Sequence, residues 1–274
     1  MKWASFHHPD FSFPVVKRKI SLELLELLEF VGEVSTQGGW ALINRSCYPN
    51  RTAYNDAVYR LRKSGLLVTE RGGGKTPRIK ITEDGTNSLA SFIRPEKRWN
   101  RKWNTLWYIL MYDVPESDRS YRNTLRRFLH SHRMGCLQKS VWITPTDIRP
   151  EFDDLTKAAA ISDFAYLFEA KTVLGLPSEV VVSDAWNFTA LNQVQERFIT
   201  VYEENLNRIQ SETLIPFEDV IRLATEEMNA YRSALVNDPL LPKSLWPKNY
   251  RGKEVVSIHR KLSNELRHHI LQSN

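Results

Sequence analysis

The stretch that decides the first part of the fold is RTAYNDAVYRLR, residues 51–62. Its apolar residues recur at helical spacing and form one narrow stripe, made of Ala53, Ala57, Val58 and Leu61. The opposite side carries polar side chains, namely Arg51, Asn55, Tyr59 and Arg62. Asn50 is suited to cap the start of a helix, and Gly65 can end it in the left-handed conformation. The sequence therefore predicts a helix over residues 51–64 that packs through one face and exposes the other.

Two predicted strands, residues 66–70 and 78–82, follow this helix. The segment between them is rich in glycine and carries basic residues, and the second strand alternates in polarity, which is typical of a hairpin. Upstream, apolar residues at helical spacing predict an amphipathic helix over residues 20–31, and a short helix is predicted over residues 40–45. Three helices followed by a basic hairpin predict a winged helix-turn-helix domain over residues 18–93.

A winged helix-turn-helix places its third helix in the major groove of DNA. Arginine, asparagine and tyrosine side chains can form hydrogen bonds with base edges or phosphates, and basic wing residues lie along the backbone or the minor groove. The residues predicted to bind DNA are Arg51, Thr52, Asn55, Tyr59 and Arg62 on the helix and Arg71, Lys75 and Arg78 on the wing. A winged helix that contacts only other proteins is the alternative.

The composition and the termini narrow the class of protein. The chain has 274 residues, of which 42% are hydrophobic and 26% charged, and these fractions exclude a disordered tail, a coiled-coil rod and a collagen-like repeat. No apolar run reaches the roughly 18 residues of a membrane span, and the N-terminal residues lack the apolar segment of a secretion signal. Cys47 and Cys136 form no CxxC motif, which favours reduced, buried thiols. We therefore expect a cytoplasmic protein with no membrane partner.

The charge is divided unevenly along the chain. The net charge is +6 over residues 1–100, +5 over residues 101–150 and −5 over residues 151–274. A basic front half favours a polyanionic partner, because neutralising phosphates releases counterions. The charge distribution therefore agrees with a double-stranded DNA partner.

The middle of the chain alternates between strands and helices. The predicted elements are a buried strand over residues 106–112, a helix over 118–133, a strand over 138–143, a helix over 150–161 and a strand over 164–170. The arginines of the first helix are expected to point outward: Arg119, Arg122, Arg126, Arg127 and Arg133. This order predicts a ferredoxin-like α/β domain over residues 104–175. Between residues 92 and 104 we expect a connecting segment that Trp99 and Trp103 dock onto its neighbours, with DNA contact as the alternative.

The last segment, residues 176–274, is predicted to be mostly helical. One apolar stripe predicts a helix from Phe188 to about Ile209, and a second stripe includes Ile221, Ala224 and Met228. The fold class is therefore α+β, with a winged helix, a ferredoxin-like domain and a helical C-terminal domain.

Two motifs of the middle domain resemble a known group of proteins. The order Tyr112-Asp113-Val114-Pro115, an arginine-bearing helix and Gln138-Lys139-Ser140-Val141-Trp142 resembles the small metal-dependent nuclease-like proteins of CRISPR spacer acquisition. That resemblance implies a metal ligand at Asp113. One carboxylate binds Mg²⁺ poorly, so we expect Asp113 to cap a turn or pair with an arginine, no metal site, no catalytic residue and no enzymatic activity. A metal-dependent nuclease is kept as the alternative function.

The whole arrangement resembles the PaaX family of phenylacetate-type transcriptional repressors. Besides the two N-terminal domains, the tail segments AWNFTALNQ (residues 185–193) and DPLLPKSLWP (residues 238–247) carry the resemblance, which extends from about residue 18 to 270. The chain departs from the family pattern at Asn229, where a histidine is expected, and at Tyr250, where a tryptophan is typical. Both departures fall in the region expected to meet the effector.

The resemblance implies a homodimeric repressor that binds a partly palindromic operator and leaves it when an acyl-coenzyme A (acyl-CoA) thioester binds. A two-fold dimer places two recognition helices roughly 34 Å apart, one turn of DNA. The phosphates of coenzyme A need cations, and the candidates in the C-terminal effector and dimerisation domain are Arg232, Lys243, Lys248, Arg251 and Lys253. No other cofactor is expected. A scaffold that only pairs chains through the central sheet is a further alternative.

Overall fold

The computed structural model describes residues 25, 28, 33–35, 51–70, 77–87, 94–114, 119–159, 165–173, 175–212 and 215–272. Over these residues, no helix combines the length and the apolar character that a membrane span requires. The chain divides into two compact units. One contains Met1–Ile93, Thr200–Ser233 and Val256–Asn274, and the other contains Arg94–Ile199 and Ala234–Val255. Each is described by itself.

The N-terminal region contains an antiparallel sheet of three strands and the helix α3 (Arg51–Lys63). The sheet order is β1 (Glu33–Ser35), β3 (Arg78–Ile81), β2 (Leu67–Glu70), with Leu67 opposite Ile81 in the register. The prediction of one helix followed by two antiparallel strands is therefore confirmed. The helix predicted over residues 20–31 is described only at Leu25 and Leu28, which are helical and buried. The short helix over 40–45 and the hairpin tip lie outside the described residues.

Helix α3 packs through a stripe that is rotated from the predicted one. The buried side chains are Tyr54, Ala57 and Leu61, whereas Ala53 and Val58 are only partly buried. Tyr54 belongs to the stripe because residues three and seven positions apart lie on one helical face. Tyrosine carries a polar hydroxyl and was not assigned to the apolar stripe, but Tyr54 is only 1% exposed in the structure.

Gly65 ends α3 as predicted. It has a φ of 75°, and the bonds Gly65 N to Arg62 O (3.0 Å) and Leu66 N to Leu61 O (2.9 Å) close the last turn. Thr82 then ties the two strands to this turn, because its hydroxyl donates to Gly65 O at 2.7 Å. The same hydroxyl accepts from Gly85 N at 3.0 Å and caps α4 (Glu83–Asn87), a short helix that the sequence did not predict.

The middle domain has the predicted ferredoxin-like arrangement, βαββαβ. Its elements are β4 (Trp107–Tyr112), α6 (Arg119–Ser131), β5 (Gly135–Gln138), β6 (Val141–Thr144), α7 (Arg149–Ala159) and β7 (Ala165–Ala170). The sheet order is β5-β6-β4-β7, and every pairing is antiparallel. The single strand predicted over residues 138–143 was wrong. The structure has two short strands there, joined by a tight connection at Lys139 and Ser140.

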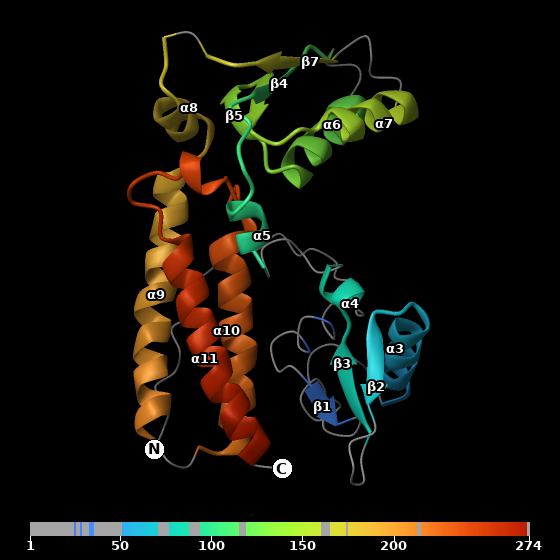
Figure 1. Ribbon diagram of the computed structural model, residues 1–274, viewed down its shortest axis with the longest axis vertical. Coiled ribbons are helices and arrows are strands. Elements are labelled where there is room, and N and C mark those ends of the chain that lie inside the picture. Colours follow the sequence, from blue (N-terminus) through green and yellow to red (C-terminus); the bar gives the residue numbers. More distant parts are fainter. Residues whose placement is uncertain are drawn as a thin grey trace. The chain divides into compact units, whose positions relative to one another are not determined.

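Helices cover the two faces of this sheet unequally (Figure 1). Leu110 of β4 packs in one core with Leu125 of α6 and Phe152 of α7. On the other face, Trp107 packs in a second core with Val181 of the short helix α8 (Ser178–Ala185). Because α8 is short, part of this second face stays uncovered.

The C-terminal region is helical, as predicted. It consists of α9 (Phe188–Ser211), α10 (Phe217–Val236), a short 3₁₀ helix η1 (Lys243–Leu245) and α11 (Gly252–Gln272). The predicted stripe of α10 was partly wrong. Its fully buried side chains include Val220, Leu223, Glu227 and Tyr231, whereas Ile221 and Met228 are only partly buried. Glu227 is buried because its carboxylate meets Nδ1 of His259 on α11 at 2.8 Å.

Candidate functional site

The polar face of α3 is exposed along its whole length. Arg51, Thr52, Asn55, Tyr59 and Arg62 are all exposed, and the Tyr59 side chain is the most prominent, with 65% of its surface accessible. The structure thus brings the five predicted helix residues together on one surface. The buried side chains behind them hold the helix against its own sheet.

The wing is described only in part. Arg78 begins β3, is exposed, and lies opposite Glu70 in the register. Arg71 and Lys75 lie outside the described residues. Lys80 on the same strand pairs with Glu70 at 3.8 Å, so its charge is partly neutralised.

Two exposed cations near this surface were not predicted to bind DNA. Arg60 and Lys63 lie in the last turn of α3, and Asp56 adds an exposed carboxylate to the same helix. The signal for the two cations was the run of basic residues at the helix end, which favours the helix dipole and also places positive charge beside the polar face.

Asp113 follows β4 and is exposed. Within the described part of the chain, no group of three histidine, cysteine, aspartate or glutamate side chains could hold a metal ion. The nearby guanidinium of Arg122 donates to Val114 O at 3.0 Å, so this arginine binds the main chain beside Asp113. Within the described residues, Asp113 therefore lacks the further oxygen ligands that the nuclease alternative requires. Cys136, expected to be buried, is exposed and has a free thiol.

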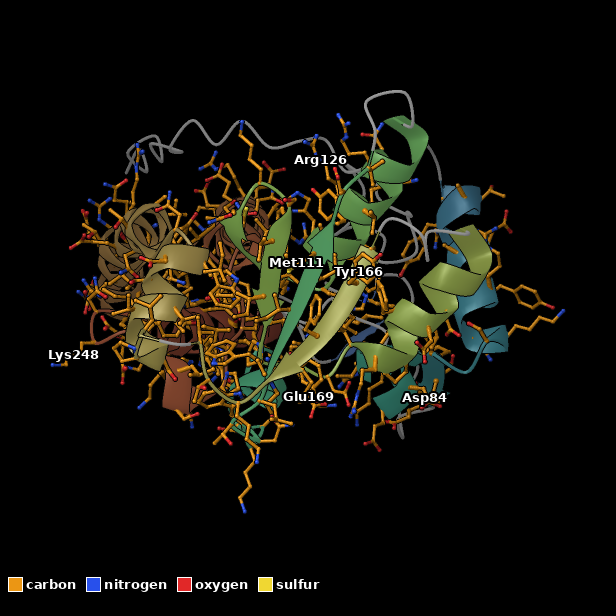
Figure 2. All side chains as sticks on the ribbon, turned by 90° about the horizontal axis from the view of Figure 1, so that it is seen from above. Asp84, Met111, Arg126, Tyr166, Glu169 and Lys248 are labelled. Atoms are coloured by element: carbon orange, nitrogen blue, oxygen red, sulfur yellow. The ribbon has the colours of Figure 1, made fainter. Side chains whose placement is uncertain are left out.

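The predicted effector residues differ in how available their charges are. Lys243, Lys248 and Lys253 are exposed, and Figure 2 shows Lys248 extending outward from the molecule. Arg251 pairs with Glu254 at 2.5 Å and with Glu196 at 3.4 Å, so its charge is already balanced.

Arg232 of α10 is 9% exposed and belongs to the other compact unit. Its Nη1 donates to Asn229 Oδ1 at 3.2 Å. Neither unit therefore contains all five candidates.

Sequence reasoning missed a deeply buried carboxylate in the described part of the second unit. Asp238 is 1% exposed and accepts hydrogen bonds from Tyr250 OH (2.6 Å), Leu240 N (2.8 Å) and Gln195 Nε2 (3.0 Å). Burial raises the pKa of Asp238 from 3.8 to about 6, even though these hydrogen bonds and nearby Arg133 favour the ionised form.

Arg133 corrects a second prediction, because it does not point outward. It has a φ of 54°, and its Nη1 donates to the carbonyls of Leu235 (3.3 Å), Val236 (3.0 Å) and Asp238. The guanidinium therefore caps the C-terminal end of α10, where unpaired carbonyls concentrate negative charge.

The connecting segment is docked by its tryptophans, as predicted. Trp99 of α5 (Glu96–Trp99) is 2% exposed, and its ring packs edge-on against Trp246 (5.3 Å between centroids) and Tyr250 (6.0 Å). Trp103 packs against Trp107 of β4 at 5.1 Å. These contacts fix the position of α5 within its unit.

Two family models match most of the chain described above. The PaaX protein central Cas2-like domain matches residues 100–182, and the PaaX-like protein C-terminal domain matches residues 186–271. The chain belongs to the PaaX family. The match to the central PaaX domain contains β4 through α7 and β7, and the match to the C-terminal PaaX domain contains α9, α10 and most of α11.

Two further proteins resemble this PaaX-family chain. It is 23% identical over 209 residues to the transcriptional repressor PaaX of Escherichia coli strain K12, a match that covers 72% of this chain and 63% of the relative. A solved structure of the uncharacterised protein Rv0674 from Mycobacterium tuberculosis has a TM-score of 0.53 at 15% identity, covering 93% of this chain and 99% of that one. The second likeness concerns the fold alone.

The two residues that we expect to depart from the PaaX pattern have defined contacts. The side chain of Asn229 accepts a hydrogen bond from Arg232, and the hydroxyl of Tyr250 donates to Asp238. In this PaaX-family member the tyrosine therefore anchors the loop between α10 and α11.

Proposed function

We propose that this protein is a sequence-specific DNA-binding transcriptional regulator that acts as a repressor. The observation that carries the proposal is the exposed polar face of α3 over a buried stripe of Tyr54, Ala57 and Leu61. The three-stranded sheet beside it supports a winged helix-turn-helix over residues 18–93, followed by proposed domains over 104–175 and 176–274. The name of the Escherichia coli relative supports repression as the outcome.

The chemistry of the exposed face suits duplex DNA. Asn55 can form a bidentate pair with adenine, and Tyr59 projects far enough to meet a base edge or a phosphate. Arg51 and Arg62 lie toward the two ends of the helix, where cations position the protein on the phosphates. In this proposal α3 reads the major groove, and Arg71, Lys75 and Arg78 of the wing follow the backbone.

We test this division of roles with duplex DNA selected from a random pool. Truncating Asn55 or Tyr59 to alanine is expected to cost about 1–3 kcal/mol on the selected site and to relax sequence choice. Truncating Lys75 or Arg78 is expected to weaken binding to all sequences and to reduce the slope of affinity against salt. The exposed Lys261 of α11 provides a control, and its alanine variant is expected to bind normally. A purified protein that ignores duplex DNA at low ionic strength would overturn the proposal.

A homodimer is part of the proposal, and the uncovered face of the central sheet supports it. Met111, Tyr166 and Phe168 are 43%, 61% and 48% exposed, and Met111 lies directly opposite Tyr166 on neighbouring strands (Figure 2). The ion pair of Arg149 with Glu169 (3.1 Å) lies toward the other face of the sheet, because Glu169 is opposite Tyr108 and alternates with Tyr166 and Phe168 along β7. Two copies can therefore meet through the same apolar surface without like-charge repulsion, as a two-fold dimer requires.

Light scattering tests the dimer with matched substitutions. Tyr166→Glu and Phe168→Glu are expected to shift the full chain from a dimer to a monomer. Leu176→Glu changes an apolar side chain of similar exposure outside the sheet and is expected to leave the dimer intact. An unchanged mass in both sheet variants would exclude this surface.

The effector in this proposal is an acyl-CoA thioester, which lowers operator affinity by binding one conformation of the dimer better than the other. The exposed Lys243, Lys248 and Lys253 provide cations for its phosphates. Repeating the DNA selection with a panel of acyl-CoA thioesters tests this part. Release by none of them would remove the acyl-CoA effector from the proposal while leaving DNA binding in place.

A further inference from the structure

Three arginines of the second unit share one electrostatic environment. Arg98 and Arg101 flank the end of α5, and Arg133 follows α6. Burial is the main cause that lowers the pKa of Arg101, Arg133 and His132, and the positive charge of Arg98 lowers each of these pKa values further. The four side chains are all partly buried.

Among the described residues, few negative charges act on this cluster. Nη1 of Arg133 donates to three main-chain carbonyls, and the Asp238 carboxylate is a negative charge that acts on this arginine. Glu151 acts on His132, but among the described residues neither Arg98 nor Arg101 forms an ion pair. The cluster therefore has more positive than negative charge.

The turn after α5 also contains buried donors that lack an acceptor. Arg101 Nη2 reaches Leu240 O at 3.4 Å, but Arg101 Nε is buried without a hydrogen-bond partner in the described residues. The indole Nε1 of Trp99 is also buried without a hydrogen-bond partner in the described residues. Leaving a buried donor unpaired is costly, so such groups in a native protein suggest a missing acceptor.

The backbone that carries Arg98 and Arg101 is held in place before any ligand binds. Trp99 lies between Arg98 and Arg101 and is held by the rings of Trp246 and Tyr250, which themselves pack at 4.8 Å. Arg101 N donates to Arg98 O at 3.4 Å, so the two arginines extend from one tight turn. Figure 1 shows this turn beside the end of α10, where Arg133 binds the carbonyls. The guanidinium groups of Arg101 and Arg133, which already donate to main-chain carbonyls, lose less freedom than mobile side chains would when they bind an anion.

Desolvation makes the site unfavourable without an anion. Burial, reinforced by Arg98, lowers the pKa of Arg101 to about 10, and burial also lowers the pKa of Arg133. A bound anion would offset part of this penalty, because phosphate oxygens accept charge-assisted hydrogen bonds from the guanidinium donors that are not used on main-chain carbonyls.

We propose that Arg98, Arg101 and Arg133 form a binding site for the phosphate or pyrophosphate group of a small molecule. The DNA backbone is a less suitable source of the phosphate, because cations that bind it must stand clear of the surface, and these three are partly buried. The anion site itself is supported by the surplus of positive charge and by the buried donors that lack an acceptor. Its assignment to the effector rests on the proposed function.

Calorimetric titration of the full chain without DNA tests the site. The probes are inorganic phosphate, pyrophosphate and coenzyme A, each titrated separately. Arg98→Gln and Arg101→Gln are expected to weaken binding by about tenfold or more, because each removes a charge-assisted pair. Arg101→Lys keeps the charge but loses the planar fork, and it is expected to weaken binding to an intermediate degree. Arg126→Gln, at an exposed arginine of α6, is expected to bind as the wild type does (Figure 2).

Several outcomes would overturn the site. They are no binding of any probe, equal binding by the wild type and both glutamine variants, or an equal loss in the Arg126→Gln control. Glutamine variants that lose duplex DNA affinity while the wild type binds no probe would assign these arginines to the DNA backbone instead. Because the titration contains no DNA, a chain that binds pyrophosphate but no DNA would retain this site and refute only the proposed regulator. The melting temperature of each variant is measured first, and Arg101→Lys keeps the test valid if Arg101→Gln does not fold.

Discussion

The Asp238→Asn substitution removes a buried negative charge while keeping the size of the side chain. In the native state burial raises the pKa of Asp238 from 3.8 to about 6. At about 1.4 kcal/mol per pH unit, this rise corresponds to a total of about 3 kcal/mol. The native state binds the proton more tightly than the unfolded state does. The stabilisation is therefore complete below about pH 4 and is lost as the pH rises through about 6.

The expected signature is a pH-dependent difference between the two proteins. Between pH 8 and pH 5 the wild type gains about 1.4 kcal/mol of stability from protonating Asp238, and the asparagine variant does not. Urea unfolding at several pH values measures this difference. Tryptophan emission is a suitable signal, because Trp99 and Trp246 pack against Tyr250, which binds Asp238.

The control for this experiment is Asp154→Asn, at an exposed carboxylate of α7. It is expected to follow the wild type at every pH. Parallel stability curves for the wild type and Asp238→Asn would refute the reasoning, because burial would then not disfavour the ionised carboxylate. A wild type that gains stability over the variant as the pH rises would refute it equally.

Three further substitutions test local packing by thermal or urea unfolding. Gly135→Ala is expected to destabilise by about 1–3 kcal/mol, because the added Cβ would lie 2.6 Å from Ala185 Cβ and 2.7 Å from the Trp186 ring. Gly65→Ala is expected to cost about 1–2 kcal/mol because of its φ of 75°, whereas Gly65→Asn is expected to cost less, since space around the site is open. Ile79→Ala, at a fully buried position of β3, is expected to cost about 2–5 kcal/mol. Negligible losses at Gly135 or Ile79, or equal losses for the two Gly65 variants, would contradict these accounts.

Local sequence patterns predicted much of the fold. The period of the apolar residues located α3 and α9, and the alternation of strands and helices predicted the ferredoxin-like domain. The β5–β6 hairpin was missed because its two strands have four residues each, too few to show a separate period. The five helix residues of the proposed DNA surface were found on one exposed face. The remaining wing residues stay predictions.

These local patterns did not predict which polar groups are buried. Arg133 was expected to be solvated, and Glu227 interrupted an apolar stripe, yet Arg133 is partly buried on main-chain carbonyls and Glu227 is fully buried. Their partners are distant in sequence, since Arg133 and Val236 are 103 residues apart and Glu227 and His259 are 32 apart. A polar residue is buried only where its partner is already placed, and no local spacing records that partner.

The sequence by itself determined which helix exposes arginine, asparagine and tyrosine, because an exposed face needs nothing beyond helical periodicity and an apolar opposite side. Only the tertiary structure decided that Asp238 is desolvated and that Arg98, Arg101 and Arg133 share a surplus of positive charge. The physical reason is the separation along the chain over which each effect acts. Periodicity acts over a few residues, whereas desolvation and Coulomb interactions depend on every group that folding brings near, whatever its place in the chain.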